Sequence, residues 1–177
     1  VEYPVDVLIY ATGFQWMATS TFNMVTGIDG RTLKSKWQDE GTKTFLGMHS
    51  NGFPNLLIMT GPQGGGGQFN FTRVCEMHAT YVAWILTTMR ERGLATVDVS
   101  KEAEAEYAAH CREVDLQSRP LRDCYSYYNG EGDGEPGSLA YYGGGHVKLV
   151  DGASSLLRGS SHVPEIKLAK LSTDNGC

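Results

Sequence analysis

Two stretches decide the fold class: DVLIYATGF at residues 6–14 and GFPNLLIMTGP at residues 52–62. Each holds a short apolar run, VDVLIY at residues 5–10 or NLLIMT at residues 55–60, and each run ends at a turn that contains glycine. Such runs are typical of strands that are buried on both faces of an α/β sheet. The small residues at their ends let the backbone approach a ligand closely. We therefore expect an α/β fold with two buried strands.

Around these stretches the sequence predicts a loop region followed by helices. Residues 28–37 and 43–46 have mixed polarity and turn residues, which indicates a partly exposed excursion with short strands. After the tetraglycine at residues 64–67, apolar residues recur at helical spacing from Phe71 to Gly93. A second helix is expected at residues 101–114, with Ser100 as N-cap and acidic residues in its first turn. From residue 119 on, Gly and Tyr predict a long covering loop, and residues 163–177 are expected to be frayed.

Composition excludes several classes of partner. The formal net charge of −5 comes from interspersed acidic and basic residues, which argues against binding to nucleic acid or to an anionic membrane. No run reaches the roughly 20 apolar residues of a membrane span, so we expect a cytoplasmic protein. The four cysteines have irregular spacing, without a C-x-x-C pair, and predict no metal site.

The order of short sequence blocks resembles Baeyer-Villiger monooxygenases, which use FAD and NADPH. The blocks, in chain order, are residues 6–14, LKSKW at residues 33–37, TFLG at 44–47, GFPNL at 52–56, GP at 61–62, and then Asn70, Glu76 and His78. The resemblance covers about the first 90 residues. It continues more loosely through YYNG at residues 127–130 and YGG at residues 142–144.

The resemblance implies the C-terminal portion of a flavoprotein monooxygenase with two dinucleotide-binding domains. Residues 1–95 would hold the returning strands and the long helix of the FAD-binding domain, whose sheet is incomplete in this chain. Residues 96–118 would form a helix, residues 119–162 a Gly/Tyr-rich covering loop with a closing segment, and residues 163–177 a tail. In this family a peroxyflavin attacks a ketone and yields an ester or lactone.

Matching the family's motifs assigns binding residues, but no catalytic residue and no metal ligand. Cofactor-binding roles fall on Thr12, Gly13, Phe14, Gly61, Pro62, Gln68, Asn70, Phe71 and Tyr127, and substrate-binding roles on Gly67, Phe69 and Phe71. Gln15 stands where an Asp is usual, and Tyr127 where a Trp is common. From its position in the apolar pattern, Phe71 has an alternative role as a core residue. We interpret His78 as a packing or hydrogen-bonding residue rather than a base, and Glu76 as a partner in a structural salt bridge or cap.

The chain has no G-x-G-x-x-G turn after a strand, so it lacks a phosphate cradle for FAD or NADPH. We therefore expect activity only with a complementary chain that carries these motifs, in a split, heterodimeric enzyme. Three alternatives stay open. The chain is a fragment of one long enzyme, or a non-catalytic remnant that stabilises a homologous flavoprotein, or part of a flavin N-hydroxylase.

Overall fold

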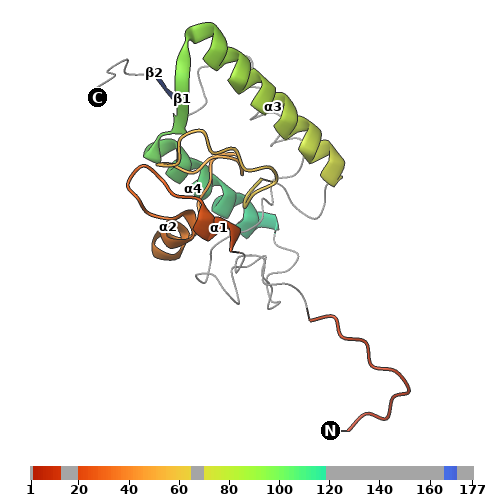
Figure 1. Ribbon diagram of the computed structural model, residues 1–177. Coiled ribbons are helices and arrows are strands. Elements are labelled where there is room, and N and C mark those ends of the chain that lie inside the picture. The colour runs from red at the N-terminus through yellow and green to blue at the C-terminus, as the bar shows by residue number, and fades with distance from the viewer. Residues whose placement is uncertain (1, 13–19, 65–69, 119–165, 171–177) are drawn as a thin grey trace.

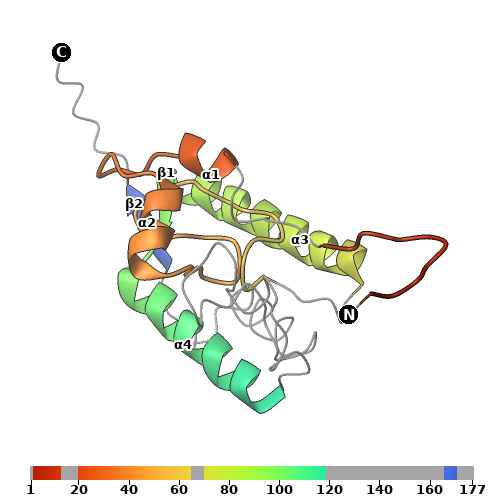
Figure 2. The same ribbon diagram turned by 90° about the horizontal axis from the view of Figure 1, so that it is seen from below.

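The computed structural model describes residues 2–12, 20–64, 70–118 and 166–170. Within these residues the elements, in chain order, are α1 (Thr21–Met24), α2 (Leu33–Glu40), α3 (Phe71–Arg92), β1 (Leu94–Val99), α4 (Lys101–Ser118) and β2 (Ile166–Lys170) (Figure 1). The two long helices α3 and α4 follow each other through β1, and an irregular segment lies between α3 and α4 (Figure 2). The division of the chain into the four ranges given above stays a prediction.

Both predicted helices form, because local signals define their ends. The Asn70 side chain accepts a hydrogen bond from the Arg73 backbone N–H at the start of α3, and Gly93 ends the helix in a left-handed conformation with φ of 61°. At the start of α4, Ser100 Oγ accepts from the Ala103 N–H at 3.1 Å, so Ser100 caps this helix as expected. The helix runs to Ser118, four residues beyond the predicted end.

The two apolar runs do not form strands in this chain. Residues 2–12, which we call the arm, are exposed throughout and extend away from the helices (Figure 1). Residues 55–60 form an irregular, partly buried segment with turns. A strand requires a neighbouring strand to take up its backbone hydrogen bonds. Among the described residues neither run pairs with a strand in a ladder; of residues 55–60, Asn55 alone bonds to β1 through its backbone, from its N–H to Val97 O. The prediction of two buried strands is therefore wrong for the chain by itself.

Two further local predictions are corrected. Residues 28–37 are expected to belong to an excursion with short strands, but helix α2 begins within this stretch, at Leu33, and runs to Glu40. Thr32 caps this helix through a hydrogen bond from the Ser35 N–H, and the spacing of Leu33 and Trp37 buries both on one face. Isolated bridges occur between Thr26 and Thr32 and between Phe45 and His49.

The tail, expected to be frayed, contributes β2 at residues 166–170, which pairs antiparallel with β1. The register places Val97 opposite Leu168 and Val99 opposite Ile166. The other edge of β1 is satisfied by the loop that holds the GFPN block. Asn55 N–H donates to Val97 O at 2.8 Å, and Val97 N–H donates to Asn55 Oδ1 at 3.0 Å. Strand β1 thus lies between β2 and this loop.

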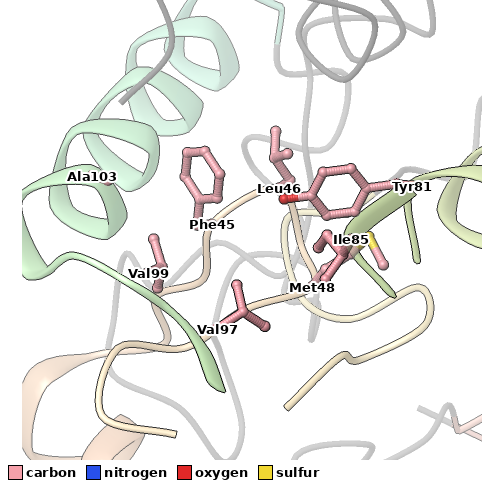
Figure 3. Close-up of a cluster of buried hydrophobic side chains, with 8 residues drawn as sticks. All are labelled: Phe45, Leu46, Met48, Tyr81, Ile85, Val97, Val99 and Ala103. Atoms are coloured by element: carbon pink, nitrogen blue, oxygen red, sulfur yellow. The ribbon is translucent and has the colours of Figure 1, made fainter. Parts of the chain in front are cut away.

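The hydrophobic core joins residues 42–64 to both long helices and to β1. Its buried members are Phe45, Leu46, Met48, Tyr81, Ile85, Val97, Val99 and Ala103 (Figure 3). A second cluster of Leu33, Trp37 and Phe53 attaches α2 to the same segment. Residues 42–64, which we call the central segment, therefore contribute to both clusters although they contain no helix or named strand.

Candidate functional site

The Gly61-Pro62 turn lies at the end of the central segment, where three glycines pack backbone to backbone. Gly61 N–H donates to Gly47 O at 3.1 Å, and Gly64 N–H donates to Gly61 O at 3.0 Å. A Cβ on Gly47 would lie 1.9 Å from Gly64 Cα, and one on Gly61 would lie 2.5 Å from Gly47 O. Only glycine fits at these positions. Packing within the chain therefore already requires a glycine at position 61, where the family motifs predict a cofactor-binding residue.

A cluster of buried polar groups forms hydrogen bonds with the turn at Pro62 and Gln63. Gln63 Oε1 accepts from the Thr44 N–H at 3.0 Å, and Gln63 Nε2 donates to Thr42 O at 3.1 Å. The Thr44 hydroxyl donates to Pro62 O at 2.7 Å, and the Tyr107 hydroxyl of α4 donates to Gln63 O at 3.1 Å. Both ends of the Gln63 amide are thus satisfied, which a side chain that is 2% exposed requires. The sequence analysis missed these residues, because a glutamine beside a glycine run carries no distinctive signal.

The backbone around the turn adopts left-handed conformations at residues other than glycine. The residues are Leu46, Asn55, Thr60 and Gln63, with φ between 53° and 62°. Thr60 is β-branched, and this conformation is rare for such a residue. All four lie in the central segment, where tertiary contacts hold the chain in conformations it would otherwise avoid.

His78 connects the turn to α3. Its Nδ1 accepts a hydrogen bond from the Thr60 N–H at 3.1 Å, and the side chain is buried. Since Nδ1 accepts, the neutral ring carries its proton on Nε2, which has no hydrogen-bond partner among the described residues. Burial lowers the pKa of His78 below its ordinary value, which favours this neutral form. The interpretation of His78 as a packing and hydrogen-bonding residue is confirmed.

The start of α3 is open to solvent. Asn70 and Phe71 are exposed, and Phe71 retains 67% of its accessible surface. The alternative interpretation of Phe71 as a core residue is therefore wrong for this chain. No acidic residue lies in the first turn of α3, so the positive end of the helix dipole is not offset there. The expected ion pair of Glu76 forms with Arg73 at 2.9 Å, with both side chains exposed.

The structure tests the position of only part of the predicted site. Gly61 and Pro62 lie in the packed turn, and Asn70 and Phe71 at the start of α3. His78 links these two parts of the chain. Thr12 is exposed on the arm. The other predicted binding residues lie outside the described residues; they are Gly13, Phe14, Gly67, Gln68, Phe69 and Tyr127. The binding roles of all these residues stay predictions.

A buried ion pair connects α2 and α4 to the central segment. Lys36 Nζ on α2 lies 2.8 Å from Glu104 Oε1 on α4, and both side chains are at most 4% exposed. Lys36 also donates to Ser50 Oγ and Asn51 O, both at 2.9 Å. Glu104 further accepts from Ser50 Oγ at 3.0 Å and from the Asn51 N–H at 2.9 Å. With every charged atom paired, this cluster has the features of a structural connection between two helices and the loop.

Two classes of site are not found in the described part of the chain. There, no group of three or more His, Cys, Asp or Glu side chains is placed to hold a metal ion. None of the helices in these residues combines the length and apolar character that crossing a membrane requires.

Sequence comparison finds relatives that include a synthase and a Baeyer-Villiger monooxygenase. The chain is 32% identical over 163 residues to pentalenolactone D synthase of Streptomyces exfoliatus, covering 85% of this chain and 27% of that protein. It is 34% identical to a Baeyer-Villiger monooxygenase of Streptomyces coelicolor, covering 79% of this chain and 24% of that protein. The chain thus spans about a quarter of the length of these relatives. No protein-family model matches the chain.

Solved structures give the same result for the fold. An oxidized steroid monooxygenase bound to NADP has a TM-score of 0.68 and 26% identity, over 81% of this chain and 26% of that one. Cyclohexanone monooxygenase from Rhodococcus sp. Phi1, bound to NADP⁺, has a TM-score of 0.69 and 21% identity, over 81% of this chain and 27% of that one. The predicted fold class is therefore confirmed: the chain has the fold of one part of an α/β flavin monooxygenase.

Proposed function

We propose that this chain, a relative of Baeyer-Villiger monooxygenases, forms the C-terminal part of such an enzyme and acts only with a complementary polypeptide that carries both dinucleotide-binding motifs. The observation that carries the proposal is the exposure of the arm, in a chain that spans about a quarter of the length of its relatives. Six apolar side chains of the arm are at least 63% exposed: Tyr3, Val5, Val7, Leu8, Ile9 and Tyr10.

The arm has the composition of an interior strand without the sheet that would bury it. Burying six large apolar side chains contributes on the order of 10 kcal/mol, which a chain leaves unused only when the covering surface is missing. Both faces of the arm are apolar, since Val5, Val7 and Ile9 alternate with Leu8 and Tyr10. The arm is therefore suited to become an interior strand of a parallel sheet in the complementary chain. We expect the resulting interface to be obligate and to bury more than about 2,000 Å².

In the assembled enzyme, FAD and NADPH are bound mainly by the complementary chain. The FAD cofactor would react with O₂, and NADPH would provide the electrons, for the conversion of a ketone into an ester or lactone. The residues of this chain shape one wall of the flavin site. The rigid turn at Gly61 and Pro62 supports the ring, and the open start of α3 at Asn70 favours negative charge at the edge of the ring.

Phe71 is the described residue best placed to contact the substrate. Its side chain is exposed at the first position of α3, beside the cap that would face the flavin. Its role would be to exclude water and to shape the pocket. Gly67 and Phe69, in the residues just before α3, are proposed to complete this wall.

Co-expression tests the proposal directly. The chain is produced alone and together with a polypeptide that contains the two G-x-G-x-x-G motifs, and both preparations are passed through gel filtration. We expect the pair to elute as a yellow complex that oxidises NADPH in the presence of a cyclic ketone and forms the lactone, and the chain alone to retain no flavin.

Two results would contradict this proposal. Stoichiometric flavin on the isolated chain would show that no complementary chain is needed. A stable complex that binds flavin but forms no product with any ketone offered would support the alternative role, a non-catalytic chain that stabilises a homologous flavoprotein.

A further inference from the structure

Thr60 has a backbone conformation that something must hold in place. Its φ of 53° lies in the left-handed region, and Thr60 immediately precedes the Gly61-Pro62 turn. A β-branched residue adopts this conformation only where the surrounding structure imposes it. The contacts of Thr60 and its neighbours therefore determine where the turn lies.

Three hydrogen bonds fix this stretch of backbone. Ile58 N–H donates to Met48 O at 2.8 Å, and Gly61 N–H donates to Gly47 O at 3.1 Å, so two of the bonds stay within the central segment. The third, from the Thr60 N–H to His78 Nδ1 at 3.1 Å, connects the segment to α3. The Thr60 hydroxyl bonds back to Met59 O and does not reach α3.

The connection through His78 reaches the helix that presents the proposed substrate wall. His78 lies two helical turns after Phe71, and α3 is a continuous helix between them. A displacement of the turn relative to His78 is therefore a displacement relative to Asn70 and Phe71. His78 is buried and Val74 beside it on the same face is buried too, so the ring has little freedom to follow such a movement.

We propose that His78 is a positioning residue that fixes the distance between the Gly61-Pro62 turn and the start of α3, and thereby sets how closely the two enclose the flavin ring. That a flavin ring lies between the turn and the start of α3 rests on the proposed function. The hydrogen bond to Thr60 rests on the structure of this chain alone. His78 acts through the Thr60 backbone and touches neither substrate nor cofactor.

Three variants separate the hydrogen bond from the volume of the side chain. His78→Asn can place its amide oxygen near the position of Nδ1 and keep the acceptor. His78→Leu keeps an apolar volume and removes the acceptor. Tyr81→Phe is the matched control, since Tyr81 lies one turn further along α3, is equally buried, and bonds to His49 and not to the turn.

The first measurement is hydrogen exchange of the Thr60 amide in the full chain, followed by NMR, which needs neither cofactor nor partner. We expect His78→Leu to accelerate exchange at Thr60 about tenfold, the effect of losing one hydrogen bond, and His78→Asn and Tyr81→Phe to leave it within about twofold. Equal exchange in His78→Asn and His78→Leu would overturn the proposal, because the side chain would then act by its volume alone.

The second measurement uses the co-purified complex and follows flavin affinity together with the ratio of product formed to NADPH consumed. We expect His78→Leu to lower this ratio at least about threefold, and His78→Asn to restore most of it. An unchanged ratio in His78→Leu, alongside faster exchange at Thr60, would refute the enclosing role. A wild-type complex without flavin would instead refute the proposed function, and the exchange data would still decide whether His78 positions the turn. If His78→Leu fails to fold, His78→Gln, whose oxygen lies near the Nε2 position, replaces it in both measurements.

Discussion

The arm and the central segment both lack helices and named strands, yet their environments are opposite. The arm is exposed at every residue from 2 to 12, whereas residues 44–50 of the central segment are all buried. The arm is also the more apolar of the two, since the central segment buries Thr44, His49, Ser50 and Gln63. Hydrophobicity by itself therefore does not decide which of these regions is buried.

The difference lies in what the rest of the chain offers to each region. The central segment finds partners for its backbone in β1, in its own turns and in the side chains of Gln63 and His78. The arm would need strands on both sides, and the described residues do not provide them. An irregular segment with partners is thus more firmly held than a strand sequence without them.

The glycine contact offers the strongest test of the central segment. Gly47→Ala would force a Cβ to within 1.9 Å of Gly64 Cα, so we expect a loss of more than about 4 kcal/mol in the free energy of unfolding. Gly30→Ala is the matched control, because Gly30 has a similar φ of 80° with nothing within 4 Å of the added carbon, and only the backbone cost of about 1–2 kcal/mol applies. Urea denaturation measures both. Equal losses would mean that the backbone at Gly64 moves away from the added Cβ without a measurable cost in stability.

The buried ion pair comes next in size. Lys36→Met leaves Glu104 buried without its cation, and we expect a loss of about 3–5 kcal/mol in stability. The double variant Lys36→Met/Glu104→Leu removes the unpaired charge as well, and we expect it to recover most of this loss. Thermal and urea unfolding of the wild-type chain, Lys36→Met, Glu104→Leu and the double variant give the coupling energy. If the double variant is as unstable as Lys36→Met, the loss of stability comes from the missing hydrogen bonds to Ser50 and Asn51 and not from an unpaired charge.

A fall in pH should weaken the central segment and leave the arm unaffected. Burial lowers the pKa of His49 from its ordinary 6.5 to about 4, because the charged ring is excluded from water. The folded chain therefore binds fewer protons than the unfolded chain between these values. Stability falls as the pH drops from about 6.5 to about 4, by up to about 3 kcal/mol. His49→Gln should lose most of this dependence in denaturation curves taken across that pH range, and a variant with the full dependence would assign it to other groups.

The arm should tolerate substitution in the chain by itself. We expect Ile9→Asp, at a side chain that is 82% exposed, to change the free energy of unfolding by no more than about 0.5 kcal/mol. The same change should prevent association with the complementary polypeptide, because a charge would enter the interior of a sheet. Gel filtration of the mixture measures this. A variant that still associates would place the arm outside the interface.

Phe71→Ala is likewise expected to change stability little. A side chain that is 67% exposed leaves no cavity when it is shortened, so we expect a loss below about 0.5 kcal/mol. In the complex, the ratio of product formed to NADPH consumed should fall if Phe71 lines the pocket. A large loss of stability with unchanged coupling would remove Phe71 from the active site.

Local signals in the sequence were sufficient for α3 and α4. Asn70, Gly93 and Ser100 mark helix ends through contacts within a few residues, so these ends could be predicted. The short helix α2 also has local signals, the Thr32 cap and the spacing of Leu33 and Trp37, which the mixed polarity of the stretch obscured. The burial of Lys36 could not be predicted, because its partner Glu104 is distant in the sequence. The two apolar runs have the composition of strands, but a strand depends on pairing with neighbouring strands, which neither run forms among the described residues.

The candidate site was predictable in outline and not in its construction. The glycine turn and the start of α3 follow from sequence motifs, and their packing against Gly47 depends on a contact between distant parts of the chain. The roles of Gln63 and Thr44 depend on burial alone, which no pattern around them indicates. Thr60 and His78 are joined in the same way, across a sequence separation of 18 residues.

An exposed strand sequence is also a template for copies of itself. Residues 5–10 combine high β-propensity with a single charge, at Asp6, which are the features of segments that stack into aggregates. Pro4, just before this stretch, and Asp6 within it are the residues that oppose such stacking. Free chains would therefore be lost by a process that depends steeply on their concentration, even if the helices and the central segment stayed folded. In the proposed enzyme, the yield of functional protein would then be set by how soon each newly made chain meets the complementary polypeptide.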